Sequence, residues 1–230
     1  MKNKTYIFFM FFISSFIFCY SLAYALNLDQ GLVAHYPFDG DANDATANNY
    51  HGTVSGDIEF VKNSSHFGAY FDGIDDVIIV YNVDNLFPGT SDFTISYWVL
   101  LGEYSQVTLS EKLFLLYGDE KYIWIQTERN ENYINFSSKS NDYGTLVPGQ
   151  IEENKWLHVV GKRVGTTISI YINGKKVDTR ESPFLYDLSN TNAQLVFGSP
   201  GFYPNSTCSG SRKIGQKRVE ITLHPPCPVW

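Results

Sequence analysis

The sequence has little of what several protein classes require. Among its 230 residues are only three cysteines and two methionines, and no apolar run of about 20 residues follows the one at the N-terminus. No window of about twelve residues or more carries apolar residues at helical spacing. Aromatic residues, by contrast, make up 16% of the chain. This combination favours a β-rich protein with ample core material.

The N-terminal segment has the features of a signal peptide. Lys2 and Lys4 precede an apolar run over residues 6–18, and residues 23–25 read Ala-Tyr-Ala, the small-x-small pattern of a cleavage site. We therefore predict removal of residues 1–25 and a secreted, periplasmic or cell-surface protein with no membrane span after that removal. An uncleaved N-terminal anchor is the alternative.

Basic residues and cysteines are scarce beyond this segment. Residues 26–230 hold 15 basic and 24 acidic residues, a net charge of −9, so nucleic acid and anionic membranes are not expected partners. The two remaining cysteines, Cys208 and Cys227, could form a disulfide in an oxidising compartment. Metal binding by them is less favoured, because no second Cys or His pair lies near at zinc-like spacing.

Short runs of alternating or apolar residues, separated by clusters of Gly, Asn, Asp and Ser, recur along the rest of the chain. This rhythm is typical of an antiparallel β-sandwich. The predicted strands cover residues 31–38, 67–71, 77–80, 93–101, 113–117, 122–127, 133–137, 156–162, 168–172 and 195–198.

The Trp156-x-His158 motif could belong to a catalytic site, but its surroundings predict structure. Period two puts Trp156 and His158 on one face of a strand that is apolar on both faces. We therefore expect a central strand, covered on both sides, and a hydrogen-bonded structural His158. Asn173-Gly174 predicts a tight turn into a further strand that contains Val177.

Two adjacent predicted strands hold the candidate ligand surface. In them, isoleucine and phenylalanine alternate with aromatic and amide residues. The second set would share one exposed face if the loop between the strands has an even length, and it consists of Tyr122, Trp124, Gln126, Tyr133 and Asn135. Flat rings and fixed amides suit sugar recognition. The alternative is that a loop or partner domain covers the rings as ordinary packing.

Five motifs occur in an order that resembles a known family. They are GLVAHYPFDG from Gly31, DATANNYHG from Asp44, FDGIDDVIIV from Phe71, SDFTISYWV from Ser91 and WLHVVGKRVGTTISIYINGKKV from Trp156. Together they resemble the laminin-G-like jellyroll domain of the concanavalin A-like lectin and glucanase superfamily over residues 28–201. The resemblance implies an all-β, two-sheet antiparallel jellyroll sandwich, usually extracellular and usually attached to larger adhesins or carbohydrate-active enzymes.

The resemblance also bears on catalysis and calcium. Glucanases of the superfamily carry Glu-x-Asp-x-(x)-Glu on one strand, which this sequence does not match, so we expect no enzyme. An EF-hand loop from Asp39 is excluded, because Asp44 and Tyr50 stand where Gly and Glu are needed. Jellyrolls of this kind often hold one calcium ion at the rim. Asp44 matches the family's loop aspartate, and Asp72 and Asp75 are the nearest other carboxylates; turn capping by these side chains is the alternative.

The C-terminal segment departs from the family pattern. Family members end in a strand of the form Gly-x-Ile-Asp-Asp-x-x-Ile-Tyr beside the first strand, which this sequence lacks. The net charge changes from −12 over residues 26–203 to +3 over residues 204–230. We therefore expect the jellyroll domain over residues 26–203 and an atypical basic tail over residues 204–230. The tail is either closed by a disulfide or, as we favour, a truncated or frame-shifted end whose last strand is lost, which would leave the first strand as an exposed edge.

These observations predict a secreted lectin-like or adhesive module whose partner is a surface glycan or an extracellular protein. The competing prediction is a structural or protein-interaction jellyroll without a sugar site. The two differ in whether the face of Tyr122, Trp124 and Tyr133 is open to a ligand.

Overall fold

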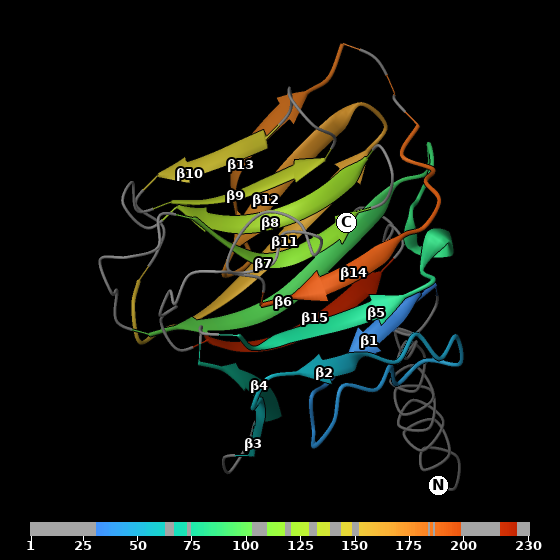
Figure 1. The fold of residues 1–230 in the computed structure, drawn as a ribbon. Helices are drawn as coiled ribbons and strands as arrows, with labels where there is room; N and C mark the ends of the chain where they lie inside the picture. Colours follow the sequence, from blue (N-terminus) through green and yellow to red (C-terminus); the bar gives the residue numbers. More distant parts are fainter. Residues whose placement is uncertain are drawn as a thin grey trace, which may run out of the picture. The chain divides into compact units, whose positions relative to one another are not determined.

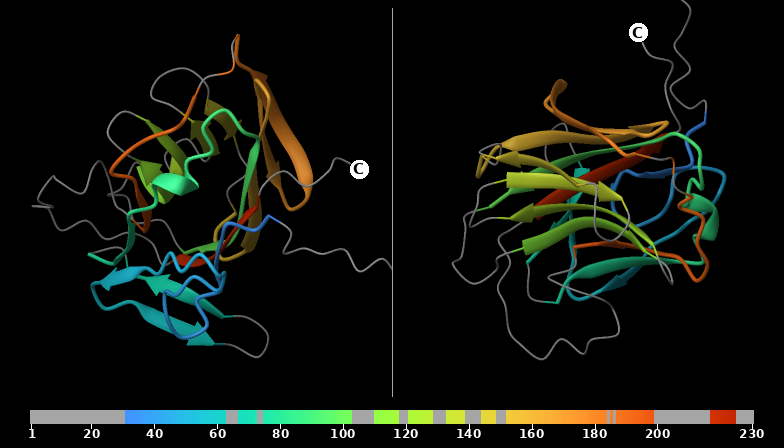
Figure 2. Two further views of the ribbon diagram at one scale, coloured as in Figure 1. Left: turned by 90° about the vertical axis from the view of Figure 1, so that its right-hand side faces the viewer. Right: turned by 90° about the horizontal axis from the view of Figure 1, so that it is seen from above.

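The computed structural model of the protein describes residues 31–62, 67–72, 75–102, 110–117, 121–128, 133–138, 144–148, 152–183, 185, 187–198 and 217–224. Within these residues the chain forms fifteen β-strands and one short 3-10 helix, η1 (Asp84–Leu86). The strands form two sheets, which Figure 1 shows as two layers and Figure 2 shows from two further sides. This arrangement confirms the predicted antiparallel sandwich.

The strand order defines an eight-stranded and a seven-stranded sheet. The eight-stranded sheet runs β13 (Lys175–Glu181), β12 (Thr167–Ile172), β11 (Trp156–Val164), β6 (Phe93–Leu101), β15 (Lys217–His224), β4 (Phe67–Phe71) and β3 (Glu59–Lys62), with β1 (Ala34–Tyr36) also paired to β15. The seven-stranded sheet runs β10 (Gly144–Pro148), β9 (Tyr133–Ser138), β8 (Tyr122–Glu128), β7 (Ser110–Tyr117), β14 (Gln194–Phe197), β5 (Val77–Tyr81) and β2 (Thr53–Ser55). The pairings between these described strands are antiparallel.

The core lies between the sheets, because one face of each central strand is apolar. In β8 and β9, the alternate residues Ile123, Ile125, Ile134 and Phe136 are at most 1% exposed. Period two then directs the residues between them to the opposite face of the sheet. The core therefore determines which side chains of these strands can meet a ligand.

Phe136 of β9 packs directly on the backbone of β11 at Gly161. A Cβ atom at Gly161 would lie 2.7 Å from Cδ2 of the Phe136 ring, which is too close for two carbon atoms in a well-packed core. The Phe136 ring also meets Phe93 of β6 edge to face, with ring centroids 6.1 Å apart. These contacts join the seven-stranded sheet to the eight-stranded one.

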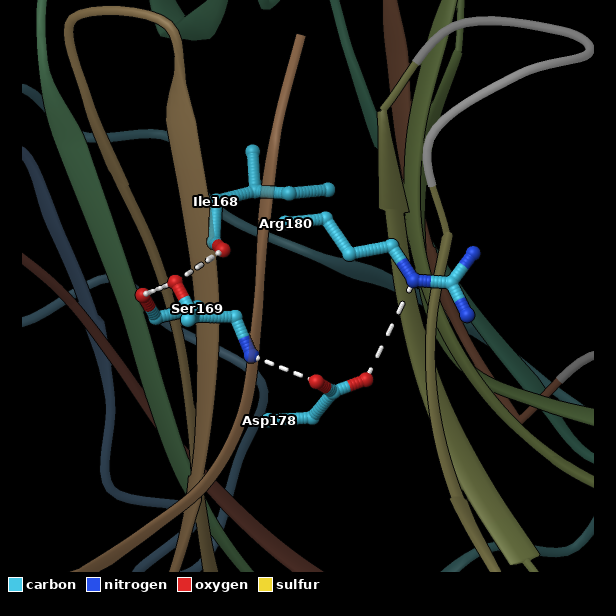
Figure 3. A network of polar contacts seen from close by, with 5 residues as sticks. Ile168, Ser169, Asp178 and Arg180 are labelled. Atoms are coloured by element: carbon cyan, nitrogen blue, oxygen red, sulfur yellow. Dashed lines mark hydrogen bonds and ion pairs between the residues drawn. The ribbon is translucent and has the colours of Figure 1, made fainter.

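The β12–β13 hairpin forms one edge of the eight-stranded sheet. Its turn residues Asn173 and Gly174 have φ angles of 49° and 77°, which confirms the predicted tight turn. Figure 3 shows Asp178 and Arg180 of β13 beside Ser169 of β12, with Arg180 Nε 3.9 Å from Asp178 Oδ2. Charged residues on an edge strand disfavour pairing with another chain.

β11 lies between β6 and β12, so the prediction of a central strand is confirmed. His158 on its outer face stacks on Trp98, with ring centroids 4.8 Å apart, and its Nε2 lies 2.8 Å from Ser96 Oγ. The predicted hydrogen-bonded histidine is therefore confirmed. The prediction that both faces are covered is wrong, because His158 is half-buried and Trp98 is 42% exposed.

The C-terminal segment supplies a strand of the eight-stranded sheet, contrary to the prediction of a tail outside the sandwich. β15 pairs with β6 along its whole length on one side, and with β1 and β4 on the other. The predicted domain end at residue 203 is therefore too early, and β1 has a neighbour. Apolar and polar residues alternate in this segment, and the register opposes Val219, Ile221 and Leu223 to buried residues of β6. The positive charge of the segment obscured that pattern in the sequence.

The predicted signal segment, Cys208 and Cys227 lie outside the described residues, so their roles stay predictions. In the part of the chain that the structure does describe, no helix is long and apolar enough to cross a membrane.

Removal of residues 204–230 should destabilise the domain, because β15 is the shared neighbour of β1, β4 and β6. A thermal melt followed by circular dichroism should show a lower melting temperature for the shortened chain. In the full chain, Ile221→Pro should also lower the melting temperature, because proline removes a backbone hydrogen bond from an interior strand. Unchanged melting of both variants would contradict the placement of β15.

The pH dependence of stability should report on His158. Burial lowers the pKa of His158 below its ordinary value of 6.5, so the unfolded chain takes up this proton at a higher pH than the folded one. The free energy of unfolding should therefore fall as the pH drops below about 6.5, and His158→Gln should lack this component. Urea unfolding at about pH 7.5 and pH 5.5 measures the difference. An identical pH dependence in both proteins would refute this role.

Candidate functional site

The outer face of β8 and β9 brings together most of the predicted ligand residues. The register opposes Trp124 to Ser137 and Gln126 to Asn135, and directly opposed residues of antiparallel strands lie on the same face. β8 ends at residue 128 and β9 begins at residue 133, so the connection has the even length on which the prediction depended. The predicted register is confirmed.

The two aromatic residues of β8 form a stacked pair. The rings of Tyr122 and Trp124 lie 3.9 Å apart between centroids, with 8° between their planes. The indole Nε1 of Trp124 donates to Asn135 Oδ1 on the neighbouring strand at 3.2 Å. This bond fixes the ring and the orientation of the amide at once. Tyr133 opposes Glu128 in the register, and its side chain lies outside the described part.

The amides of this face are buried more deeply than the rings. Gln126 and Asn135 are each 7% exposed, whereas Tyr122 and Trp124 are half-buried. Part of each ring therefore remains accessible beside amides that have little conformational freedom. The structure thus lies between the two predicted alternatives, bare rings and fully covered rings.

Neighbouring strands extend this face with residues that the sequence analysis missed. The register opposes Tyr122 to Tyr117, Tyr117 to Gln194, and Gln194 to Tyr81. The Tyr117 hydroxyl donates to Gln194 Oε1 at 2.6 Å. Burial, together with the nearby Tyr81, raises the pKa of Tyr117 to about 12, so its hydroxyl remains a neutral donor. Tyr81 is 50% exposed.

We call this set of outer-face residues the aromatic surface. Its members come from β5, β14, β7, β8 and β9, and they are Tyr81, Gln194, Tyr117, Tyr122, Trp124, Gln126 and Asn135. All are neutral aromatic or amide side chains. They offer flat apolar rings for stacking, and donors and acceptors in fixed positions, which is the chemistry of an uncharged polyhydroxyl ligand.

Asp44, a predicted metal ligand, organises its own loop. Its carboxylate accepts hydrogen bonds from the backbone N–H groups of His35, Thr46 and Tyr50, and from the Thr46 hydroxyl, at 2.8–3.1 Å. The side chain is 4% exposed. The bond to the N–H two residues ahead is the turn-capping geometry that the sequence left as the alternative.

The other two predicted metal ligands lie together. One carboxylate oxygen from each of Asp72, Asp75 and Asp76 lies within 4.8 Å of the others. Asp76 Oδ2 accepts the backbone N–H of Asp72 at 2.8 Å, and burial raises the pKa of Asp76. Closely spaced carboxylates are compatible with the oxygen ligands that Ca²⁺ prefers. Asp44 is not a member of this group, and calcium binding by Asp72 and Asp75 stays a prediction.

Solved structures with the same fold are binding domains of larger proteins. The binding domain of Paraclostridial Mosquitocidal Protein 1 matches with a TM-score of 0.69 and 17% identity, over 87% of this chain and 50% of that one. The receptor binding domain of botulinum neurotoxin D matches with a TM-score of 0.68 and 13% identity, over 86% and 50%. The chain therefore spans about half the length of these two relatives.

A third structure is similar in size to this chain. It is domain 4 of AbnA, a GH43 extracellular arabinanase from Geobacillus stearothermophilus, in complex with arabinotriose. It matches with a TM-score of 0.59 and 20% identity, over 85% of this chain and 93% of that one. At these identities the three structures establish the fold.

Comparison with curated protein sequences finds no match. Residues 71–211 match the sequence profile of the family Laminin_G_3, described as the concanavalin A-like lectin/glucanases superfamily. That segment covers more than half of the chain and contains most of the motifs on which the resemblance rested. The chain belongs to the Laminin_G_3 family of the concanavalin A-like superfamily.

Proposed function

We propose that the protein is a secreted glycan-binding module without catalytic activity, and that the aromatic surface is its binding site. The observation that carries the proposal is the stacked pair of Tyr122 and Trp124, with Trp124 Nε1 held by Asn135 Oδ1. A half-buried indole in a fixed position on the outside of a sheet has surface available for a partner.

The chemistry of the aromatic surface suits sugars. The C–H faces of a sugar ring are apolar and pack on flat aromatic rings, while its hydroxyls need donors and acceptors at defined positions. Trp124 and Tyr122 supply the rings, and the half-buried Tyr117 and Gln194 supply the polar groups. Gln126 and Asn135, each 7% exposed, lie beneath this layer, where Asn135 Oδ1 accepts the Trp124 indole N–H. Little entropy is then lost when a sugar binds, because the site is already ordered.

The solved relatives support the same proposal. Domain 4 of the arabinanase was solved in complex with arabinotriose. Another relative is a structure of botulinum neurotoxin type C, whose cell entry depends on interaction with two ganglioside molecules. It matches with a TM-score of 0.64 and 16% identity, over 86% of this chain and 48% of that one. Both descriptions concern recognition of sugar-bearing molecules, which we extend to this chain as a proposal.

The neutral character of the aromatic surface supports the proposal of binding without catalysis. Hydrolysis of a glycosidic bond usually needs two carboxyl groups, one on each side of the bond. The members of the aromatic surface carry none, and Glu128, which the register places on the same face of β8, is a single carboxyl group. The competing proposal, a structural or protein-interaction domain, would leave the stacked rings without a sugar to bind.

The proposal of secretion rests on the predicted signal segment, and the proposal of calcium binding rests on Asp72 and Asp75.

Trp124→Ala should weaken glycan binding without unfolding the domain. Loss of a stacked ring removes on the order of 1–3 kcal/mol of contact, or about ten- to hundredfold in affinity. A glycan array probed with and without calcium identifies the best sugar, and isothermal titration then compares the variant with the natural chain. Calcium-dependent signals on the array would support the predicted ion.

Trp98→Ala is the matched control, because Trp98 is a half-exposed tryptophan on the outer face of the other sheet. It should leave glycan affinity within about twofold of the natural value. If Trp124→Ala unfolds the domain, or if Trp98→Ala weakens binding as much, the aromatic surface is not the site.

A further inference from the structure

One row of the aromatic surface crosses four strands at one end of the seven-stranded sheet. β5, β14, β7 and β8 are neighbours in this order. Tyr81 is the last residue of β5, Gln194 the first of β14, Tyr117 the last of β7 and Tyr122 the first of β8. The register places each directly opposite the next. We call these four residues the terminal row.

The terminal row is long compared with a single sugar. Neighbouring strands lie about 4.8 Å apart, so three steps from Tyr122 to Tyr81 span about 14 Å. One sugar unit of a linear chain advances by a distance similar to one strand spacing. The row therefore offers room for about three consecutive units laid across the strands.

The chemistry of the terminal row is continuous along this length. Tyr122, stacked on Trp124, supplies rings at one end, and Tyr81 supplies a ring at the other, half of which is exposed. Between them, the Tyr117 hydroxyl and the Gln194 amide form a 2.6 Å hydrogen bond. Rings at both ends and a polar pair between them match a chain whose units alternate apolar faces with hydroxyl edges.

The charge around the row favours an uncharged ligand. The four side chains are neutral, and residues 26–230 carry a net charge of −9. This charge disfavours anionic sugars, although salt screens the repulsion beyond about a nanometre. Lys121, next to Tyr122 in the sequence, donates a hydrogen bond from its ammonium group to the backbone carbonyl oxygen of Ser189, with Nζ and O 2.9 Å apart.

We propose that the aromatic surface binds a linear, neutral oligosaccharide of about three sugar units, which runs across the strands from Trp124 and Tyr122 to Tyr81. The inference rests on the function proposed above and specifies the ligand of that same site. It assigns Tyr81, which the sequence analysis missed, to the far end of the site. A single terminal sugar would occupy only the Trp124 end.

A length series tests the proposal. Arabino-, xylo- and cello-oligosaccharides of one to five units are titrated into the natural chain, and into the Tyr81→Ala, Tyr81→Phe and Trp124→Ala variants. In the series that binds, affinity should rise with each unit up to about three and then level off. Tyr81→Ala should lower trisaccharide affinity about tenfold and leave disaccharide affinity within about twofold, because only the longer chain reaches Tyr81. Trp124→Ala should weaken every length.

Two variants separate contact from fold. Tyr81→Phe keeps the ring and should retain trisaccharide affinity. Tyr171→Ala removes a tyrosine from the outer face of the opposite sheet and should change no affinity. Thermal melts of the two Tyr81 variants should lie within a few degrees of that of the natural chain, since Tyr81 is exposed and lies outside the core.

Several results would overturn the inference. The first is an affinity that does not depend on the number of sugar units. The second is a loss of affinity in Tyr81→Ala that is the same for every oligosaccharide length, or no loss at all. The third is a failure of every neutral oligosaccharide series to bind. Binding restricted to sialylated oligosaccharides, lost in Trp124→Ala, would overturn this inference and leave the proposed function standing. Failure of every sugar on the array would overturn both.

Discussion

The contact between Phe136 and Gly161 is the constraint on which the site depends. It presses a ring of β9 on the bare backbone of β11, where a Cβ would lie 2.7 Å from the ring, and so fixes both the distance between the sheets and the inward face of β9. Because side chains alternate along a strand, Asn135 and Ser137, which flank Phe136, must then point away from the core. Asn135 in turn holds the indole of Trp124. The packing of the core thus orders the outer face.

The second global constraint is the strand supplied by the C-terminal segment. β15 lies between β6 and β4 and also pairs with β1, so segments separated by more than 100 residues share one sheet. This pairing completes the layer against which the seven-stranded sheet packs. The binding surface and the closing strand lie on different sheets, and they are coupled through the core between them. Loss of either layer would remove the support of the aromatic surface.

Local patterns in the sequence predicted those parts of the structure that depend on neighbouring residues. Alternation in β8 and β9 placed Trp124 and Asn135 on one face, and Asn173-Gly174 predicted its turn. Long-range pairing was not predictable in this way. Tyr81, Tyr117 and Gln194 meet only because β5, β14, β7 and β8 lie side by side, an order that no local pattern contains. β15 was not predicted, because the positive charge of residues 204–230 obscured the alternation of apolar and polar residues in it. The four hydrogen-bond donors to Asp44 come together only in the folded loop.

Sugar binding on the outer face of the seven-stranded sheet, at Trp124, is the central proposal for this protein. The indole N–H resonances of the tryptophans, observed by NMR in the ¹⁵N-labelled chain and assigned by single Trp→Phe substitutions, test this claim directly. Titration with the best-binding oligosaccharide should shift the Trp124 indole resonance, whose N–H is held by Asn135, and leave those of Trp98 and Trp156 on the opposite sheet in place. A shift at Trp98 or Trp156 with an unmoved Trp124 would contradict the account.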